Sequence, residues 1–459
     1  MKNSKLNIFF DHLKKKDDFY SLAIFRIGFG IVMMVEVLRF YLYGFIENLF
    51  INQDFHFKYT YFHWVEAPSD NYTYLLFFSI FISAFLVAVG LFYRIASILL
   101  FLSYTYFFLI DEAYYNNHFY LIVIVSFLII FVPLGKFWSL DCYLRKIPQK
   151  KHIERFWLWV MRTPMSIVYV YGGIAKFDQD WISGIAPKIL LTKANQGTFL
   201  EPLMRYEWTA HFYAWSGMLF DLFVPFAILY KKTRWWAFTA ACMFHINNAF
   251  VFDIGIFPYL ALFLTLLYLE SNYPKYFLPK KLKLYLSNIY SQNIIYEKGA
   301  DWETPANRFC VSVIGILFFI QLILPLRHFL YPGNTTWHRE GHKFSWRMML
   351  SEKRAEYIFN VQHPSTGEKR FIELNQFLNP IQIRAMAGRP NLILEFAHML
   401  NSVIQKNAKF DPIITAEIKI SLNNSKTQYF FDQTKDLSLI PLNTPAYLWI
   451  YPLKRSYTN

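Results

Sequence analysis

Long apolar runs separated by short charged segments dominate the first two thirds of the chain. About 20 apolar residues are enough for a helix to cross a bilayer. Runs close to this length occupy residues 19–45, 72–92, 95–110, 118–134, 156–175, 210–230, 235–251, 254–269 and 311–326. The pattern predicts a polytopic α-helical membrane protein with about nine transmembrane helices.

The charges between these runs alternate in sign. Basic linkers contain Lys14 to Lys16, Arg94, Arg145 to Arg155, Lys231 to Arg234, and Lys275 to Lys283. The linkers between them carry Asp111, Glu112, Asp178, Asp180 and Asp253. Since positive loops stay in the cytoplasm, the amino terminus is expected to be cytoplasmic and the segment after the last span non-cytoplasmic. The membrane would be the plasma or inner membrane of a bacterium, or the endoplasmic reticulum of a eukaryote.

After the last apolar run the periodicity changes. Residues 369–374 and 416–422 alternate or are rich in β-forming residues, and Asn423-Asn424-Ser425 is typical of a hairpin turn. Residues 391–404 have the spacing of one amphipathic helix. We therefore expect a membrane domain over residues 1–330 and an extramembrane α+β domain, rich in β-strand, over residues 331–459. The long connector 184–208 is expected to form short interfacial helices on the outer side.

Composition narrows the class further. The chain is 55% hydrophobic and 20% aromatic, which is too apolar for a soluble enzyme of 459 residues. Its net charge of +14 comes from lysines in short loops, so a nucleic-acid partner is not expected. Its 3 cysteines form no CxxC pair, and no histidine spacing inside the spans is typical of a metal site, so neither disulfides nor a metal is predicted.

Several polar residues share one depth at the outer ends of the predicted spans. They are Asn116, Asn117 and His118 at the start of the fourth span, Lys176 at the end of the fifth, and His245 and Asn248 in the seventh. Ionisable groups at membrane depth tend to face the bundle interior and to be functional. A lysine in apolar surroundings can lose its charge and act as a base.

Each of these residues also has a structural interpretation. Lys176 would be a snorkelling anchor whose ammonium group reaches the outer headgroups. His118 would be an interfacial histidine bonded to a backbone carbonyl, and His245 would form a hydrogen bond between helices. Topology alone leaves both interpretations open for all three residues.

Two further features of the spans are explained by packing. Glu36 and Arg39 lie three residues apart, which favours a structural ion pair. Gly172 and Gly173 would let a helix or a flat ligand approach the backbone closely.

Short motifs in a fixed order carry a resemblance to a known family. They include Tyr115-Asn116-Asn117-His118-Phe119-Tyr120, Trp138-Ser139-Leu140-Asp141, Ala175-Lys176-Phe177-Asp178, Phe244-His245 with Asn248, His328-Phe329, and Phe344-Ser345-Trp346 with Met348-Met349. In this order the chain resembles the vitamin K-dependent gamma-glutamyl carboxylase family. The membrane part resembles the horizontally transferred transmembrane (HTTM) domain, and the tail resembles the family's lumenal domain.

The resemblance implies an activity and roles for residues. Lys176 would deprotonate reduced vitamin K, a phylloquinol or menaquinol, and His118 with Asn117 would steer or stabilise charged intermediates. Oxygen would convert the quinol to its epoxide through a strongly basic alkoxide, which removes a proton from a substrate glutamate before carbon dioxide adds. The expected partners are therefore a Glu-containing protein or peptide on the non-cytoplasmic side, membrane lipids and the quinone.

Further substrate-binding positions follow from the same resemblance. They are Asn116, His245, Asn248, Phe257, His328, Met348 and Met349. Core packing is the alternative account of Phe257 and the two methionines.

Two departures from the family pattern concern the protein substrate. His342 stands where an aromatic residue is usual, and the sequence ends at Asn459, earlier than the animal enzymes. Both predict that part of the surface that recognises the substrate protein differs. Two alternatives to a coupled carboxylase remain at this point: a quinol epoxidase uncoupled from carboxylation, and a quinone- or lipid-binding membrane protein without catalysis.

Overall fold

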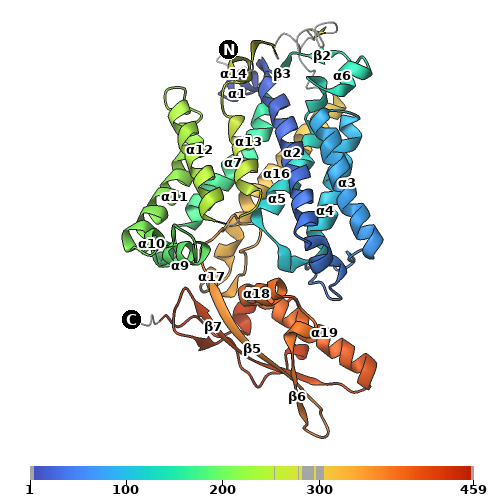
Figure 1. Ribbon diagram of the computed structural model, residues 1–459, viewed down its shortest axis with the longest axis vertical. Coiled ribbons are helices and arrows are strands. Elements are labelled where there is room, and N and C mark those ends of the chain that lie inside the picture. The colour runs from blue at the N-terminus through green and yellow to red at the C-terminus, as the bar shows by residue number, and fades with distance from the viewer. Residues whose placement is uncertain (1–4, 253, 278, 282–293, 296–303, 456–459) are drawn as a thin grey trace.

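The computed structural model describes residues 5–252, 254–277, 279–281, 294–295 and 304–455. A bundle of long helices forms one part of the molecule, and a smaller domain with a sheet forms the other (Figure 1). Asp253 and Lys283, two of the charged residues in the predicted loops, lie outside the described residues.

Every predicted apolar run contains a helix. These helices are α2 (Tyr20–Leu42), α3 (Asp70–Val89), α4 (Tyr93–Ile110), α5 (Asn117–Phe131), α7 (Arg155–Ala175), α11 (Glu207–Ala227), α12 (Arg234–Val251), α13 (Phe257–Leu266) and α16 (Pro305–Ile323). Among the described residues, 4 helical segments are long and apolar enough to cross a membrane: α2, α3, α4, and α16 with its extension to Leu330. The others are short or carry charged residues, so nine transmembrane helices stays a prediction.

Bare apolar surface on the bundle supports membrane association. Phe223 on α11 is 62% exposed, and Trp236 and Phe250 on α12 are each 81% exposed. Large apolar side chains gathered on an outer surface are unfavourable in water and favourable against lipid. These exposed side chains support membrane association of the bundle, whereas a transmembrane course of α11 and α12 stays a prediction.

The two ends of the bundle carry different elements. The helices α1 (Lys5–Lys14), α6 (Leu140–Leu144) and α14 (Pro274–Phe277) lie at the end far from the smaller domain (Figure 1). Two short strand pairs join loops at this end: β1 (Lys16–Asp18) with β3 (His152–Glu154), and β2 (Gln149–Lys150) with β4 (Ile294–Ile295). The absolute orientation of the bundle in the membrane stays a prediction.

Short helices lie at the opposite end, as expected for the long connector. The connector contains α9 (Ile185–Ala194) and α10 (Glu201–Met204), and α8 (Gln179–Ile182) lies directly before it. After α16, the last long helix of the bundle, the chain reaches the second domain through η5 (Leu324–Leu330) and α17 (Thr335–His338).

The C-terminal domain contains a four-stranded sheet covered by helices. The strand order is β6 (Lys369–Ile372), β5 (Lys353–Gln362), β7 (Ile413–Leu422) and β8 (Gln428–Tyr429), all antiparallel. The covering helices are α18 (Pro380–Gly388) and α19 (Pro390–Ala408). Asn423 and Asn424 have φ values of 49° and 57°, as a tight hairpin between β7 and β8 requires. The predicted strand-rich tail is confirmed, whereas a domain boundary at residue 330 stays a prediction.

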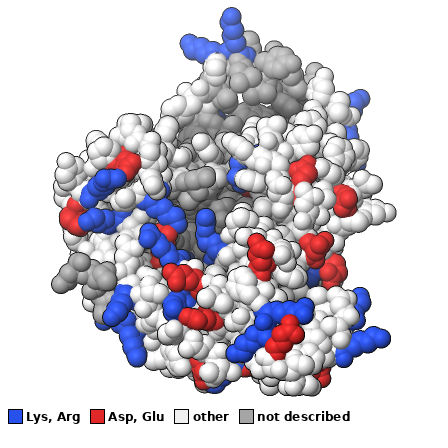
Figure 2. Space-filling view, turned by 60° about the horizontal axis from the view of Figure 1, so that its bottom comes forward, with Lys and Arg blue, Asp and Glu red and all other residues white. Residues whose placement is uncertain are grey.

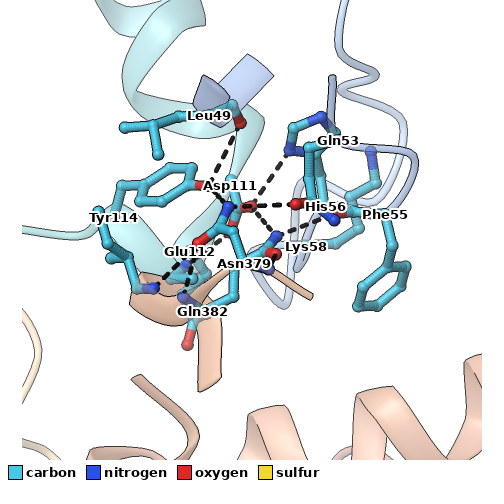
Figure 3. A network of polar contacts seen from close by, with 12 residues as sticks. Leu49, Gln53, Phe55, His56, Lys58, Asp111, Glu112, Tyr114, Asn379 and Gln382 are labelled. Atoms are coloured by element: carbon cyan, nitrogen blue, oxygen red, sulfur yellow. Dashed lines mark hydrogen bonds and ion pairs between the residues drawn. The ribbon is translucent and has the colours of Figure 1, made fainter. Parts of the chain in front are cut away.

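A buried polar network joins the two parts (Figure 3). Asp111 Oδ2 accepts a hydrogen bond from Gln382 Nε2 at 2.9 Å and lies 3.1 Å from His56 Nδ1. Asn379 caps α18 and also donates to the Tyr114 hydroxyl at 2.6 Å. Gln382, on α18, also donates to the carbonyl of Phe55. Since such bonds fix distance and direction, the outer loops of the bundle hold the C-terminal domain in a defined position.

Candidate active site

Lys176 lies where α7 ends and the chain turns back. Its backbone N–H donates to the Gly173 carbonyl at 3.1 Å, and Asp178 accepts a bond from the N–H of Asp180 to begin α8. Trp181 Nε1 donates to the Ala214 carbonyl of α11 at 3.0 Å, which anchors the turn. The indole ring centroid then lies 5.4 Å from Lys176 Nζ, within range of a cation–π contact.

The ammonium group of Lys176 is paired inside the bundle. Nζ lies 2.5 Å from Asp221 Oδ2 on α11 and 3.3 Å from the Gly172 carbonyl. Lys176 is 8% exposed and Asp221 is 6% exposed. A snorkelling anchor would extend toward water, so this geometry does not fit that interpretation.

The glycine pair on α7 allows this contact. A Cβ on Gly173 would lie 2.7 Å from Leu222 Cγ, and one on Gly172 would lie 3.4 Å from Asp221 Oδ2. Close approach of α11 therefore requires the small residue at Gly173. The glycines are explained by helix packing, and that packing brings the acid to the amine.

A cavity of about 200 Å³ lies beside this pair. The predicted residues that line it are Asn116, Asn117, His118, Lys176, His245, Asn248, Phe257, Met348 and Met349. They come from α5, α7, α12, α13 and a loop of the C-terminal part. The predicted residue that does not line it is His328, whose Nδ1 lies 2.8 Å from the Pro325 carbonyl.

His245 joins two helices at the cavity wall. Its Nε2 lies 2.7 Å from the Tyr169 hydroxyl of α7, and that hydroxyl lies 3.0 Å from Thr265 Oγ1. The expected hydrogen bond between helices is therefore present. Nδ1 of the same ring is buried without a partner among the described residues.

Asn117 and His118 are held at the start of α5. Asn117 Oδ1 accepts a bond from the Tyr115 hydroxyl at 3.0 Å, and that hydroxyl accepts the N–H of Phe344 at 2.7 Å. The ring of His118 lies 6.1 Å from that of Phe257. No hydrogen bond from the His118 ring to a backbone carbonyl occurs in the described part of the chain, in contrast to the structural interpretation of this residue.

The loop that completes the cavity has an unusual backbone. Phe344, Trp346 and Met349 have φ values of 60°, 57° and 51°, a region that non-glycine residues seldom occupy. Trp346 is 1% exposed and packs on Tyr120 with ring centroids 5.2 Å apart. The folded loop, residues 341–349, places Arg347, Met348 and Met349 against the cavity.

His328 lies behind this loop. A Cβ on Gly341 would lie 2.5 Å from His328 Cα, so the two backbones are in direct contact. The structure therefore places His328 in the support of the loop rather than in the cavity wall.

Two known families match the chain. The HTTM domain matches residues 14–273, more than half of the chain, and the vitamin K-dependent gamma-carboxylase lumenal domain matches residues 306–456. The chain belongs to the vitamin K-dependent gamma-carboxylase family. The HTTM match contains Lys176, Asp221 and the polar residues of α5 and α12, and the lumenal-domain match contains the loop that closes the cavity. No solved structure matches the chain.

Other residues of the cavity were not predicted from the sequence. They are Asp221, Tyr169, Trp181, Tyr213 and Arg347, all of which line the cavity. The sequence could have indicated Asp221 as a site residue, because it is an acidic residue inside an apolar run. Arg347 Nε is buried and has no partner among the described residues, which only the structure reveals.

The cavity suits the family's quinol better than a metal. Aromatic and apolar side chains such as Phe244, Phe257 and Met165 form most of the wall, with a few polar groups between them. In the described ranges no group of three His, Cys, Asp or Glu residues could hold a metal ion, and the absence of a metal cofactor stays a prediction.

Proposed function

We propose that this protein is a quinol-dependent peptidyl-glutamate carboxylase in which Lys176 and Asp221 together form the base. The observation that carries the proposal is the buried contact of 2.5 Å between Nζ and Oδ2 at the cavity wall. Reduced vitamin K or a menaquinol would supply the chemistry when bound, with oxygen and carbon dioxide as the other co-substrates.

A lysine–aspartate pair can act as one base. As an ammonium and a carboxylate, or as an amine and a carboxylic acid, the pair has no net charge. In either form it can accept one proton from a ligand hydroxyl, after which it carries one positive charge. Because the pair is buried, that charge strongly stabilises a negative oxygen beside it. The sequence suggested a neutral lysine, and Asp221 now explains how that lysine is kept in the bundle.

Neutral donors and one further cation complete the site. The amide of Asn117 and the rings of His118 and His245 provide hydrogen-bonding groups for developing negative charge, as in an oxyanion hole. Arg347 offers a guanidinium group with an unpartnered Nε. Guanidinium groups match carboxylates, so Arg347 is suited to hold a substrate glutamate.

The position of the cavity supports two kinds of substrate. Its walls belong to helices with apolar outer faces, where a membrane-dissolved quinol can enter. Its closing loop belongs to the C-terminal part, where a polar peptide can arrive. We propose that the glutamate-containing substrate binds on the non-cytoplasmic side and meets the quinol at this junction.

The experiment that tests this proposal follows both products at once. Purified protein is incubated with phylloquinol or menaquinol, oxygen, labelled bicarbonate and a short Glu peptide, and epoxide and peptide-bound label are measured. Both products are expected, and both should be lost in Lys176→Ala. The matched control is Lys435→Ala, which removes an exposed lysine far from the cavity.

The remaining outcomes separate the competing functions. Epoxide without label would assign an epoxidase uncoupled from carboxylation. Quinol binding that persists in Lys176→Ala, with no product from folded wild-type protein, would assign a quinone-binding protein instead.

A further inference from the structure

A second and much larger depression lies between the bundle and the C-terminal domain. It has a volume of about 1040 Å³ and is bordered by α9, the first half of β5, and α18. We call it the β5 groove. Figure 2 turns this end of the molecule forward and shows Lys and Arg side chains gathered in the middle of the face, next to Asp and Glu side chains.

One wall of the β5 groove is an unpaired strand edge. β6 pairs only with residues 359–362 of β5, whereas β7 pairs with the whole of residues 353–362. The N–H of Asn423 donates to the Glu352 carbonyl at 2.9 Å, so Glu352 and every second residue after it direct backbone groups toward β7. Lys353, Ala355 and Tyr357 therefore direct theirs toward the groove.

A hydrogen bond just after the end of β5 confirms that the alternate residues direct their backbone groups to the β6 side. His363 continues the same alternation, and its N–H donates to the Glu368 carbonyl on the β6 side at 2.9 Å. No described strand covers the β6 side of residues 353–357. An open edge of this kind accepts an added strand through backbone hydrogen bonds.

The side chains around the edge favour an acidic occupant. Four basic side chains line the groove, from Lys188, Lys193, Arg354 and Arg384, against two acidic ones, from Glu207 and Glu352, while the ammonium group of Lys353 donates to the Trp337 carbonyl. Both acids are already paired with lysines of α9. Arg384 is exposed and forms no ion pair with any described residue, so its charge is available to a ligand.

The β5 groove lies next to the candidate active site, with α9 between them. Leu190 and Leu191 on α9 line the cavity, while Lys188 and Thr192 on the same helix line the groove. The backbone passes from Met349 at the cavity to Lys353 at the groove within four residues. A peptide along β5 would therefore lead toward the cavity.

We propose that the β5 groove binds the glutamate-containing substrate as an extended strand added to the free edge at Lys353, Ala355 and Tyr357, with Arg384 as the unpaired positive charge for its acidic side chains. This inference rests on the proposed function, because that function supplies the acidic peptide. Five residues of strand span about 17 Å, so the edge can order one short acidic segment beside the glutamate that reacts.

The first test uses backbone methylation of the ligand. A short fluorescein-labelled peptide of alternating Glu and Val is titrated into detergent-solubilised full-length protein, and anisotropy gives Kd. One version carries N-methyl groups on every Val and another on every Glu. Since a strand bonds to its neighbour through alternate residues, one version should bind about tenfold more weakly and the other almost unchanged. Equal affinity of the two versions would overturn the proposal.

The second test changes the protein. Ala355→Pro removes the N–H that faces the groove, and prolines are tolerated at strand edges, so Kd should rise about tenfold. Ala355→Val keeps the N–H and suits a strand, so it is the matched control and should bind normally. If Ala355→Pro does not fold, Arg384→Glu replaces it, and its Kd should rise with a weaker dependence on salt.

Failure of this inference is distinguishable from failure of the proposed function. The peptide titration is repeated in Lys176→Ala, where binding is expected although turnover is lost. If epoxide formation depends on Lys176 but the two N-methylated peptides bind equally well, the groove proposal would be overturned and the proposed function would stand. A stable dimer that Ala355→Pro dissociates would also overturn it, by assigning the edge to a second copy of this chain.

Discussion

At the residue scale, the proposed chemistry depends on the contact between Lys176 and Asp221. A buried charge that loses its partner is strongly unfavourable, and both residues of this pair are buried. In the proposal each residue has a structural and a catalytic role, and a single substitution changes both at once. A double substitution separates the two roles.

We predict that Asp221→Asn destabilises the protein by about 3–5 kcal/mol and lowers kcat for epoxide formation by about 100-fold or more. The double variant Lys176→Met with Asp221→Leu removes both charges and should recover most of the stability but none of the activity. Thermal unfolding in detergent and epoxide assays measure the two effects. Recovered activity in the double variant would contradict the assignment of the pair as the base.

A second prediction concerns the hydroxyl of Tyr115, which bridges Asn117 and the backbone of Phe344. Tyr115→Phe removes both hydrogen bonds, at a loss of about 1–2 kcal/mol of stability, and frees the amide of Asn117 to rotate. We expect KM for the quinol to rise several-fold because the closing loop is held less firmly. Tyr106→Phe is the control, since that hydroxyl donates to the Glu66 carbonyl at the surface. An unchanged KM would show that other contacts position the loop.

At the element scale, the packing of α7 against α11 sets the geometry of the site. The two helices approach at Gly173, and the acid of α11 lies one position before Leu222, the residue that Gly173 contacts. A change in helix separation there is transmitted directly to the distance between Nζ and Oδ2. The element is therefore as important to the chemistry as the residues that it carries.

We predict that Gly173→Ala separates these helices, because the added Cβ would meet Leu222 Cγ at 2.7 Å. The expected cost is about 1–3 kcal/mol of stability, with a fall in kcat. Adding Leu222→Ala should restore part of both. Gly315→Ala is the matched control in α16, since nothing lies within 4 Å of its added Cβ and alanine favours a helix. Equal effects of the two alanines would contradict the packing account.

At the scale of the whole molecule, the C-terminal domain is seated on the outer loops of the bundle. Phe57 and Ala113, from those loops, belong to the hydrophobic core of the domain. Glu395 Oε1 on α19 accepts the backbone N–H of Lys58 at 2.6 Å. Burial, together with the nearby Glu112 and Asp111, raises the pKa of Glu395 to about 8 from an ordinary value of 4.5, although the hydrogen bond from Lys58 lowers it.

This raised pKa predicts the direction of a pH effect. Between pH 4.5 and about 8 the folded protein keeps a proton on Glu395 that the unfolded chain releases, so stability falls as pH rises through this window. Glu395→Gln keeps an oxygen acceptor for Lys58 and cannot ionise. Its melting temperature should exceed that of the wild type near pH 8 and match it near pH 4.5, as measured by thermal unfolding in detergent.

The control for this pH series is Glu368→Gln, which removes an exposed carboxylate from the loop between β5 and β6. It should leave the pH dependence of melting unchanged. A wild-type protein whose stability rises between pH 4.5 and 8, with the same slope in Glu395→Gln, would contradict the burial of this carboxyl.

Much of the arrangement could be predicted from local sequence. Apolar runs located the helices within a few residues, and loop charges grouped Asn117, His118, Lys176 and His245 at one depth because sidedness depends only on span order. The hairpin at Asn423 also followed from turn chemistry. These are features that neighbouring residues determine.

The missing parts depend on distant contacts. An acidic residue in an apolar run gives no indication of which helix it will meet, so the pairing of Asp221 with Lys176 required the structure. Met348 and Met349 reach the cavity because their loop has positive φ values. The residues with these φ values are not glycines, so the sequence does not indicate this backbone conformation. The open edge of β5 arises because β6 is short, which depends on how the sheet ends.

Helix α9 is the common wall of the cavity and of the β5 groove. Any movement of this helix that accompanies filling of one side changes the affinity of the other. Thermodynamic linkage then requires reciprocity: the factor by which a bound acidic peptide changes the affinity for quinol equals the factor by which bound quinol changes the affinity for the peptide. Through the ten residues of α9, Ile185–Ala194, a bound quinol would thus change the affinity for the peptide, and a bound peptide would change the affinity for the quinol.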